Sequence, residues 1–131
     1  MKRLLFICVE NSCRSQLAEG FASTLGRGAV KAYSAGSKPS GVINPRAIAF
    51  MREKSIDISG QRSKGFNDLP ITEFDYAVSM GCQEICPFIR GAVHIAWDIR
   101  DPKNLSDEEF RAIRDEIGEK VAVLVSQIGE T

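Results

Sequence analysis

The sequence contains a single histidine, no excess of either charge and no long apolar run. Lysine and arginine total 17, as do aspartate and glutamate, so the zero net charge gives no reason to expect binding to nucleic acid or to an anionic membrane. No apolar run approaches the ~20 residues of a membrane-spanning helix. Near the start, Glu10, Asn11 and Arg14 interrupt an apolar stretch before it reaches the roughly 7–15 residues of a secretory signal. We therefore expect a cytoplasmic protein.

The residues best suited to specialised chemistry are the four cysteines: Cys8, Cys13, Cys82 and Cys86. In a secreted protein they would suffice for two disulfides, whereas in a reducing cytosol they indicate catalysis, redox chemistry or metal binding. The C-x4-C and C-x3-C spacings, with His94 as the one histidine, differ from the C-x2-C pairs of zinc sites. We therefore predict thiol chemistry without a metal or cofactor.

The length of 131 residues predicts one domain, residues 1–131, and apolar patterning predicts its elements. Strands are expected at 3–8, 29–36, 74–80 and 92–97. Helices are expected at 15–25, from Asn44-Pro45 to Met51, and from Ser106 to Ile128, where Ser106 and Glu109 form a capping box. Alternating strands and helices predict an α/β fold with a parallel sheet, whose ligands bind at the carboxyl ends of the strands.

The most informative motif is C-x5-R-S, which runs from Cys8 to Ser15 between the first strand and the first helix. A loop at such a junction turns backbone N–H groups inward, and Arg14 can bind a tetrahedral oxyanion in a bidentate manner. An electropositive cup of this kind lowers a thiol pKa from about 8.5 to roughly 3.5–7.5, which makes Cys8 a candidate nucleophile. The Ser15 hydroxyl could donate to the sulfur. C-x5-R also arises by chance, but its place between strand and helix favours the functional interpretation.

The segment CVENSCRSQLAEGFA resembles the active-site loop of the low-molecular-weight tyrosine phosphatases and, more closely, of the arsenate reductases built on the same fold. The resemblance extends to YSAG (33–36), NPRAI (44–48), IDIS (56–59), CQEICP (82–87), DP (101–102) and FRAIRDEI (110–117). It implies a three-layer α/β/α fold with a four-stranded parallel sheet. It further implies that Cys8 attacks the substrate, that Arg14 binds the oxyanion, and that Asn11 and Ser15 order the loop. Glu10, Ser12 and Cys13 complete the oxyanion loop, and Cys13 is assigned to packing.

Two positions depart from the family pattern. Glu10 stands where the family often has glycine, and we expect its carboxylate to point away from the anion. Some reductases of this type bind potassium near the loop, and by similarity Asn11, Glu19 and Ser34 would line such a site. Lys64 stands where an acidic residue is expected, which argues against potassium activation.

The resemblance also supplies an acid and a thiol relay. Asp101-Pro102 matches the general acid, with Asp98 as the fallback, although Asp-Pro is also common in turns. By similarity, Cys82 resolves the Cys8–arsenic adduct and Cys86 then resolves the Cys8–Cys82 disulfide. Thioredoxin is the implied reductant; a glutaredoxin or a low-molecular-weight thiol stays open. Two buried structural thiols are the alternative for this pair.

The predicted function is therefore reduction of arsenate to arsenite by a monomer, with phosphate or sulfate as substrate analogues. A low-molecular-weight tyrosine phosphatase is the second candidate, but Lys103 follows Asp101-Pro102 where phosphatases usually have an aromatic residue. A non-enzymatic oxyanion-binding or arsenic-sensing module is the third. It would need neither the acid nor the thiol pair.

Overall fold

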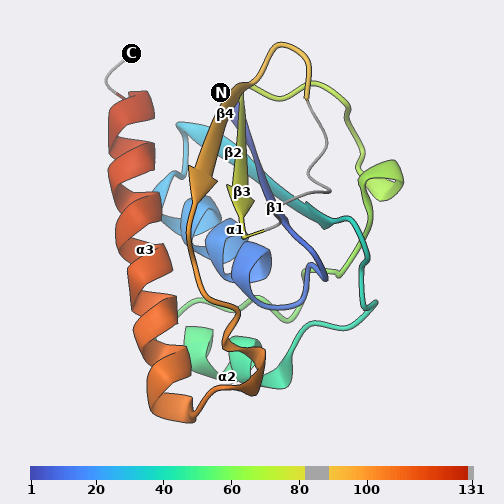
Figure 1. The fold of residues 1–131 in the computed structure, drawn as a ribbon. Helices are drawn as coiled ribbons and strands as arrows, with labels where there is room; N and C mark the ends of the chain where they lie inside the picture. Colours follow the sequence, from blue (N-terminus) through green and yellow to red (C-terminus); the bar gives the residue numbers. More distant parts are fainter. Residues whose placement is uncertain (82–88, 130–131) are drawn as a thin grey trace.

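Four parallel strands form a sheet in the order β2-β1-β3-β4 (Figure 1). The computed structural model describes residues 1–81 and 89–129. Within these residues the strands are β1 (Lys2–Cys8), β2 (Val30–Gly36), β3 (Tyr76–Met80) and β4 (Val93–Trp97). The helices are α1 (Arg14–Leu25), α2 (Pro45–Arg52) and α3 (Asp107–Gly129), with short 3₁₀ turns at Phe66–Asp68 and Pro102–Asn104. Each predicted strand and helix is confirmed to within two residues at either end.

The sheet is buried unequally on its two faces. Leu4, Phe6, Val78 and Met80 join the larger core, to which α1, α2 and α3 contribute their apolar sides. Leu5, Ile7 and Ala77 face a smaller cluster, which is covered in the described residues by the segment around Phe66–Phe74 and by Ile89 and Ala92. Strand β1 is therefore covered on both faces, as its unbroken apolar sequence predicts.

Local signals set the helix boundaries. The Asn44 side chain accepts a 2.9 Å hydrogen bond from the Arg46 N–H, which caps α2 ahead of Pro45. Ser106 Oγ accepts a 3.2 Å hydrogen bond from the Glu109 N–H, so the predicted capping box opens α3. The apolar stripe of α3 is buried throughout its length: Phe110, Ile113, Ile117, Val121, Leu124 and Ile128. In α1, Leu17 and Phe21 are buried, whereas Leu25, at which the helix ends, is half exposed.

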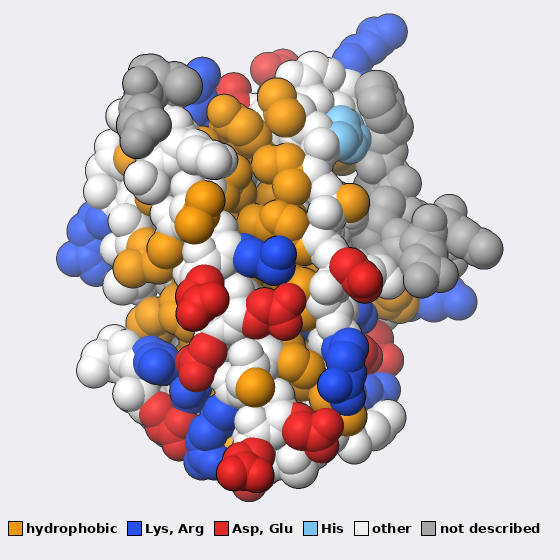
Figure 2. Space-filling view, turned by 60° about the vertical axis from the view of Figure 1, so that its left-hand side comes forward, with side chains coloured by type: hydrophobic (Ala, Val, Ile, Leu, Met, Phe, Trp, Pro, Cys, Tyr) orange, Lys and Arg blue, Asp and Glu red, His pale blue; other side chains and the backbone are white. Residues whose placement is uncertain are grey.

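The strands all point toward one end of the molecule, where β1 leads into α1 and where α2 lies (Figure 1). The N-terminus and the last turn of α3 lie at the opposite end. On the face dominated by α3, charges of both signs are interspersed beside an apolar strip where Trp97 and Ile95 of β4 meet Val123 and Leu124 (Figure 2). No helix in the described part of the chain is both long and apolar enough to cross a membrane.

Candidate active site

The anion loop, residues 8–15, is shaped by its backbone at the carboxyl end of β1. Asn11 has φ of 50°, a left-handed conformation that asparagine tolerates better than most residues. Cys8 pairs in register with Gly36 of β2, and a Cβ at position 36 would lie 2.5 Å from the Val9 carbonyl oxygen. The loop therefore turns closely against the backbone of Gly36, in the place where backbone N–H groups of such loops can bind an anion.

Asn11 is the buried hub of the loop. Its Oδ1 accepts hydrogen bonds from the backbone N–H of Lys64 at 2.9 Å and from Gln16 Nε2 at 2.9 Å. A backbone N–H can only donate, so the bond from Lys64 fixes which end of the amide carries the oxygen. The amide nitrogen then points to Ser15 Oγ, 2.7 Å away. All the amide's acceptor capacity and one of its donors are used, which holds the loop in one arrangement.

Ser15 connects this hub to the nucleophile. Its Oγ lies 2.9 Å from Cys8 Sγ, and both residues are buried. Because Ser15 accepts from Asn11, its single hydroxyl hydrogen is available to donate to the Cys8 sulfur. The arrangement predicted for Asn11, Ser15 and Cys8 thus has a continuous hydrogen-bonded path.

Arg14 offers one edge of its guanidinium to the pocket. Its Nη1 donates to the Ile99 carbonyl at 3.0 Å, and Gly81 leaves room for this group, since a Cβ there would lie 2.3 Å from Nη1. Nε is a buried donor with no hydrogen-bond partner in the described residues. Nη2 lies 3.9 Å from Asp101 Oδ2. The Nε–Nη2 edge is therefore available for two parallel hydrogen bonds to an oxyanion.

The pocket at this loop has a volume of about 230 Å³. It is lined by the nucleophile, the arginine and the acid together with the rest of the loop: Cys8, Val9, Glu10, Ser12, Cys13, Arg14 and Asp101. Among the described residues that line it, Asp101 is exposed, whereas Cys8 and Arg14 are buried. The structure therefore places Asp101 at the rim. Asp98, the fallback acid, is exposed and does not line this pocket.

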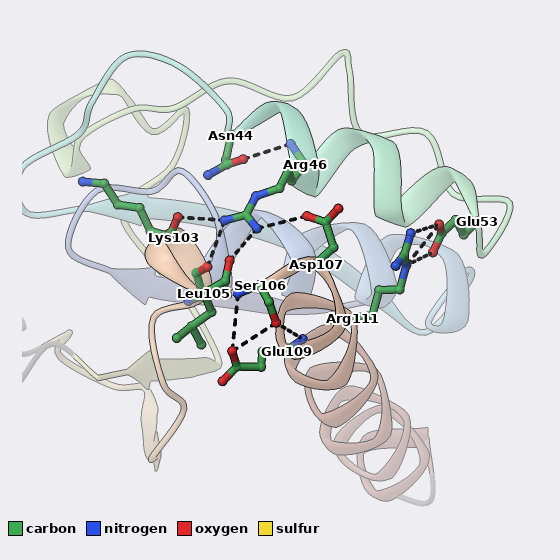
Figure 3. A network of polar contacts seen from close by, with 10 residues as sticks. Asn44, Arg46, Glu53, Lys103, Leu105, Ser106, Asp107, Glu109 and Arg111 are labelled. Atoms are coloured by element: carbon green, nitrogen blue, oxygen red, sulfur yellow. Dashed lines mark hydrogen bonds and ion pairs between the residues drawn. The ribbon is translucent and has the colours of Figure 1, made fainter.

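The acid segment, residues 98–105, is held by Arg46 of α2 (Figure 3). The guanidinium donates to the backbone carbonyls of Lys103 and Leu105, both at 2.7 Å, and to that of Pro102 at 3.2 Å. The segment's own turn is closed by Asp101 Oδ1, which accepts from the Lys103 N–H at 3.0 Å. At the start of α2, the Asn44 N–H donates to the Ser12 carbonyl at 3.1 Å. One helix therefore fixes both loops that meet at the pocket.

Two further loop residues differ in their surroundings. Burial, with the nearby Asp101 and Cys8 charges, raises the pKa of the Cys13 thiol from 9.0 to about 12. A thiol of this kind is inert at neutral pH, in keeping with a packing role. The Glu10 carboxylate forms a 2.9 Å ion pair with Lys103 Nζ, which raises the pKa of the lysine. Cys82 and Cys86 lie outside the described residues.

Of the residues expected to line a potassium site, Glu19 and Ser34 are in contact, and a lysine side chain lies beside them. Ser34 Oγ donates to Glu19 Oε1 at 2.5 Å, and Lys64 Nζ lies 3.8 Å from the same oxygen. Burial raises the pKa of Glu19, and the Lys64 charge opposes that shift. Because an internal ammonium group already faces the one carboxylate, this donor set does not fit a potassium ion.

The chain is similar along its whole length to proteins of one family. Residues 3–131 match the model of the low molecular weight phosphotyrosine protein phosphatases. The chain belongs to that family. A glutaredoxin arsenate reductase of Synechocystis is 40% identical over 98% of this chain and 99% of its own. A solved arsenate reductase in a phosphate-binding state superposes with a TM-score of 0.88 at 39% identity, covering 98% of this chain and 99% of its own.

A third relative, a thioredoxin-dependent arsenate reductase of Corynebacterium glutamicum, is 30% identical with a TM-score of 0.81; the match covers 98% of this chain and 62% of that one. The predicted fold and the resemblance to the reductase branch are confirmed by these relationships. Within the phosphotyrosine phosphatase family, the four-stranded sheet and the loop between β1 and α1 are thus shared with proteins named arsenate reductases.

Sequence reasoning missed two residues at this site. Gln16 is fully buried and its Nε2 donates to Asn11 Oδ1, to the Asn11 carbonyl and to the Arg62 carbonyl. Its place beside Ser15 in the RSQ segment was the signal available. Arg46 belongs to the matched NPRAI segment, but nothing in the sequence indicates that it reaches residues 102–105.

Proposed function

We propose that this protein reduces arsenate to arsenite, with Cys8 as nucleophile and Cys82 and Cys86 as a thiol relay. The observation that carries the proposal is the Nε–Nη2 edge of Arg14 in the pocket that Cys8 also lines, since its Nε is a buried donor without a hydrogen-bond partner in the described residues. A tetrahedral oxyanion bound to that edge and to the loop N–H groups would lie next to the sulfur. The arsenate reductases among its relatives support arsenate as the oxyanion.

In the first step, the Cys8 thiolate forms a bond to arsenic. An arsenate hydroxyl departs from the opposite side as water, after it accepts a proton from Asp101. The carboxylic acid is needed because an unprotonated oxygen is a poor leaving group. Arg14 and the loop N–H groups stabilise the charge on the remaining oxygens. Arsenic is still As(V) at this stage.

The relay supplies the two electrons. The Cys82 thiolate attacks Cys8 Sγ, a Cys8–Cys82 disulfide forms, and the electron pair of the sulfur–arsenic bond stays on arsenic, which leaves as arsenite. The Cys86 thiolate then attacks Cys82 and releases the Cys8 thiolate. The resulting Cys82–Cys86 disulfide accepts two electrons from an external dithiol. Such a cycle requires a reducing compartment, which fits a cytoplasmic location.

We assign thioredoxin as the reductant because three cysteines in series leave an intramolecular disulfide, the form that a dithiol reductant exchanges with. The name of the Synechocystis relative, a glutaredoxin arsenate reductase, favours glutaredoxin as the alternative reductant. The thiol steps that form the Cys82–Cys86 disulfide are the same with either reductant. Only the protein that reduces this disulfide differs.

The experiment is arsenite formation measured per enzyme with either a thioredoxin or a glutaredoxin system as sole reductant. Cys82→Ser should form no arsenite. Cys86→Ser should release about one arsenite per enzyme and trap a Cys8–Cys82 disulfide on the peptide map, because that bond forms before Cys86 is required. Multi-turnover reduction by both variants would exclude the relay.

Phosphate monoester hydrolysis is the second candidate activity, since the family is named for it. It needs Cys8, Arg14 and Asp101 but neither Cys82 nor Cys86. Weak p-nitrophenyl phosphate hydrolysis should therefore survive in both relay variants. Hydrolysis that greatly exceeds arsenate reduction in the unmodified protein would make the phosphatase the main activity.

A further inference from the structure

An ion pair joins the anion loop to the acid segment beside the pocket, which Glu10 lines. Lys103 Nζ lies 2.9 Å from Glu10 Oε2, and the two residues are 93 positions apart in the sequence. Both side chains are partly exposed, Glu10 at 37% and Lys103 at 48%. We call this pair the Glu10–Lys103 bridge. Both of its residues depart from the pattern of the phosphatases, where glycine and an aromatic residue are usual.

Both ends of the bridge are anchored. The Glu10 carbonyl accepts hydrogen bonds from the Ser40 N–H and from Ser63 Oγ, each at 3.0 Å. The Lys103 carbonyl accepts from Arg46 at 2.7 Å, and its N–H donates to Asp101. The backbones on both sides are therefore held, and the side chains span the space between them. The ion pair therefore joins two segments whose backbones are already held by other hydrogen bonds.

The bridge does little for anion binding itself. A carboxylate beside an anion site opposes binding, and its pairing with a lysine cancels that charge. Glu10, which is half-buried, lines the pocket together with the exposed Asp101, while Cys8 and Arg14 are buried. The effect of the bridge is instead steric, because it places two side chains between the anion loop and the acid segment.

The in-line geometry of the displacement determines which substrates these two side chains would hinder. In an in-line displacement the leaving oxygen lies opposite the Cys8 sulfur, so it points from the floor toward Asp101 at the rim. In arsenate that oxygen carries only hydrogen. In a phosphate monoester it carries an organic group, which must pass between the anion loop and the acid segment. The Glu10–Lys103 bridge joins those two segments.

We propose that the Glu10–Lys103 bridge is a specificity determinant that admits free inorganic oxyanions and hinders oxyanions with an organic substituent. The inference rests on the proposed function only in taking Cys8 as the floor of the pocket. An exposed ion pair opens at small free-energy cost, so the discrimination is graded: we expect about a two- to fivefold effect.

The test compares two dianions at the same pocket, inorganic phosphate and phenylphosphonate, which cannot be hydrolysed. Each is titrated as a protectant of Cys8 against alkylation, and the ratio of the two protection constants is the readout. Glu10→Ala should strengthen the binding of both anions, and Lys103→Ala should weaken it. In both variants and in the double variant, phenylphosphonate should gain relative to phosphate by the same about two- to fivefold factor, since either loss opens the bridge.

Arg100→Ala is the matched control, because it removes an exposed ion pair of the same segment, to Glu109 at 3.4 Å, that does not reach the anion loop. Its ratio should equal that of the unmodified protein. The exchanged pair, Glu10→Lys with Lys103→Glu, should return the ratio toward the original value. An unchanged ratio in all three Ala variants, or no recovery in the exchanged pair, would overturn the proposal. Neither result depends on whether the protein forms arsenite, which the reductase assay decides separately.

Discussion

The anion loop and the acid segment meet at one pocket but are built differently. In the anion loop, Asn11, Ser15 and Arg14 are buried and their hydrogen-bond partners come from neighbouring backbone and buried side chains. In the acid segment, Asp101 is exposed, and the backbone is held from outside by Arg46. The oxyanion cradle is thus fixed before a substrate arrives, whereas the acid is positioned from a distance. Loss of a buried hydrogen bond in the anion loop should therefore alter binding, whereas loss of Asp101 or of its support from Arg46 should alter rate.

The largest difference should come from the acid. Asp101→Asn removes the proton donor and should lower the first chemical step by ~10²–10⁴. Phosphate protection of Cys8 should change little, because the hydrogen bond from Arg14 to the Ile99 carbonyl, at 3.0 Å, holds the guanidinium without the longer 3.9 Å contact to Asp101. Asp98→Asn is the matched control, as that exposed carboxylate does not line the pocket. A larger loss from Asp98→Asn, measured in single-turnover arsenite release, would transfer the role to Asp98.

The cradle can be disturbed through a glycine. Gly81→Ala should weaken phosphate binding by about tenfold to a hundredfold, because the new methyl group would displace Arg14 Nη1 and break its bond to Ile99. Gly28→Ala is the control: its φ of 87° matches the 89° of Gly81, and it has open space around it. Both variants lose the same backbone freedom, so equal phosphate affinity in the two would contradict the steric argument.

Arg46→Gln should lower the rate by a smaller factor than Asp101→Asn. It removes the donors to three carbonyls of the acid segment, and we expect about a tenfold lower kcat with phosphate affinity retained. Arg111→Gln is its counterpart across the α2–α3 contact (Figure 3). Arg46 lies over the Phe110 ring and Arg111 over the Phe50 ring, so both losses should lower Tm. A fall in kcat of equal size in Arg111→Gln would show that stability, rather than positioning, limits the rate.

The smallest effect should appear in stability alone. Hydrogen bonds from Arg111 and Arg114 lower the pKa of Glu53 from 4.5 to about 2. A depressed pKa stabilises the folded state above about pH 4.5, and the contribution is lost as pH falls toward 2. Glu53→Gln should therefore lower Tm at neutral pH without a change in kcat. The difference from the unmodified protein should shrink as pH falls through that window; a constant difference would refute the assignment.

The sequence predicts what local patterns determine. The run that ends at Cys8, the caps at Asn44 and Ser106 and the stripe of α3 all arise from neighbouring residues, and the structure has them in place. The C-x5-R-S loop could be located for the same reason. Its chemistry, however, was recognised through resemblance to a family, because spacing alone does not distinguish a nucleophile from a buried thiol.

Contacts between distant segments could not be predicted in this way. Arg46 reaches the acid segment across 56 to 59 positions, and Glu10 reaches Lys103 across 93. Neither partner has a local signature, since arginine on a helix and lysine in a loop are usually solvated. The Lys64–Glu19 contact illustrates the same point. The sequence indicates a cation near the expected potassium site, but it does not give the distance of that cation from the carboxylate.

The central claim is that Cys8 acts as the nucleophile at a preformed oxyanion pocket. Competitive alkylation at mildly acidic pH, with each cysteine followed by mass mapping, tests it most directly. We predict that Cys8 reacts fastest of the four and that phosphate or sulfate protects it, whereas Cys13, whose pKa burial raises to about 12, reacts slowly with or without the anion. Faster labelling of Cys13 or Cys86, with no protection by either anion, would contradict the account.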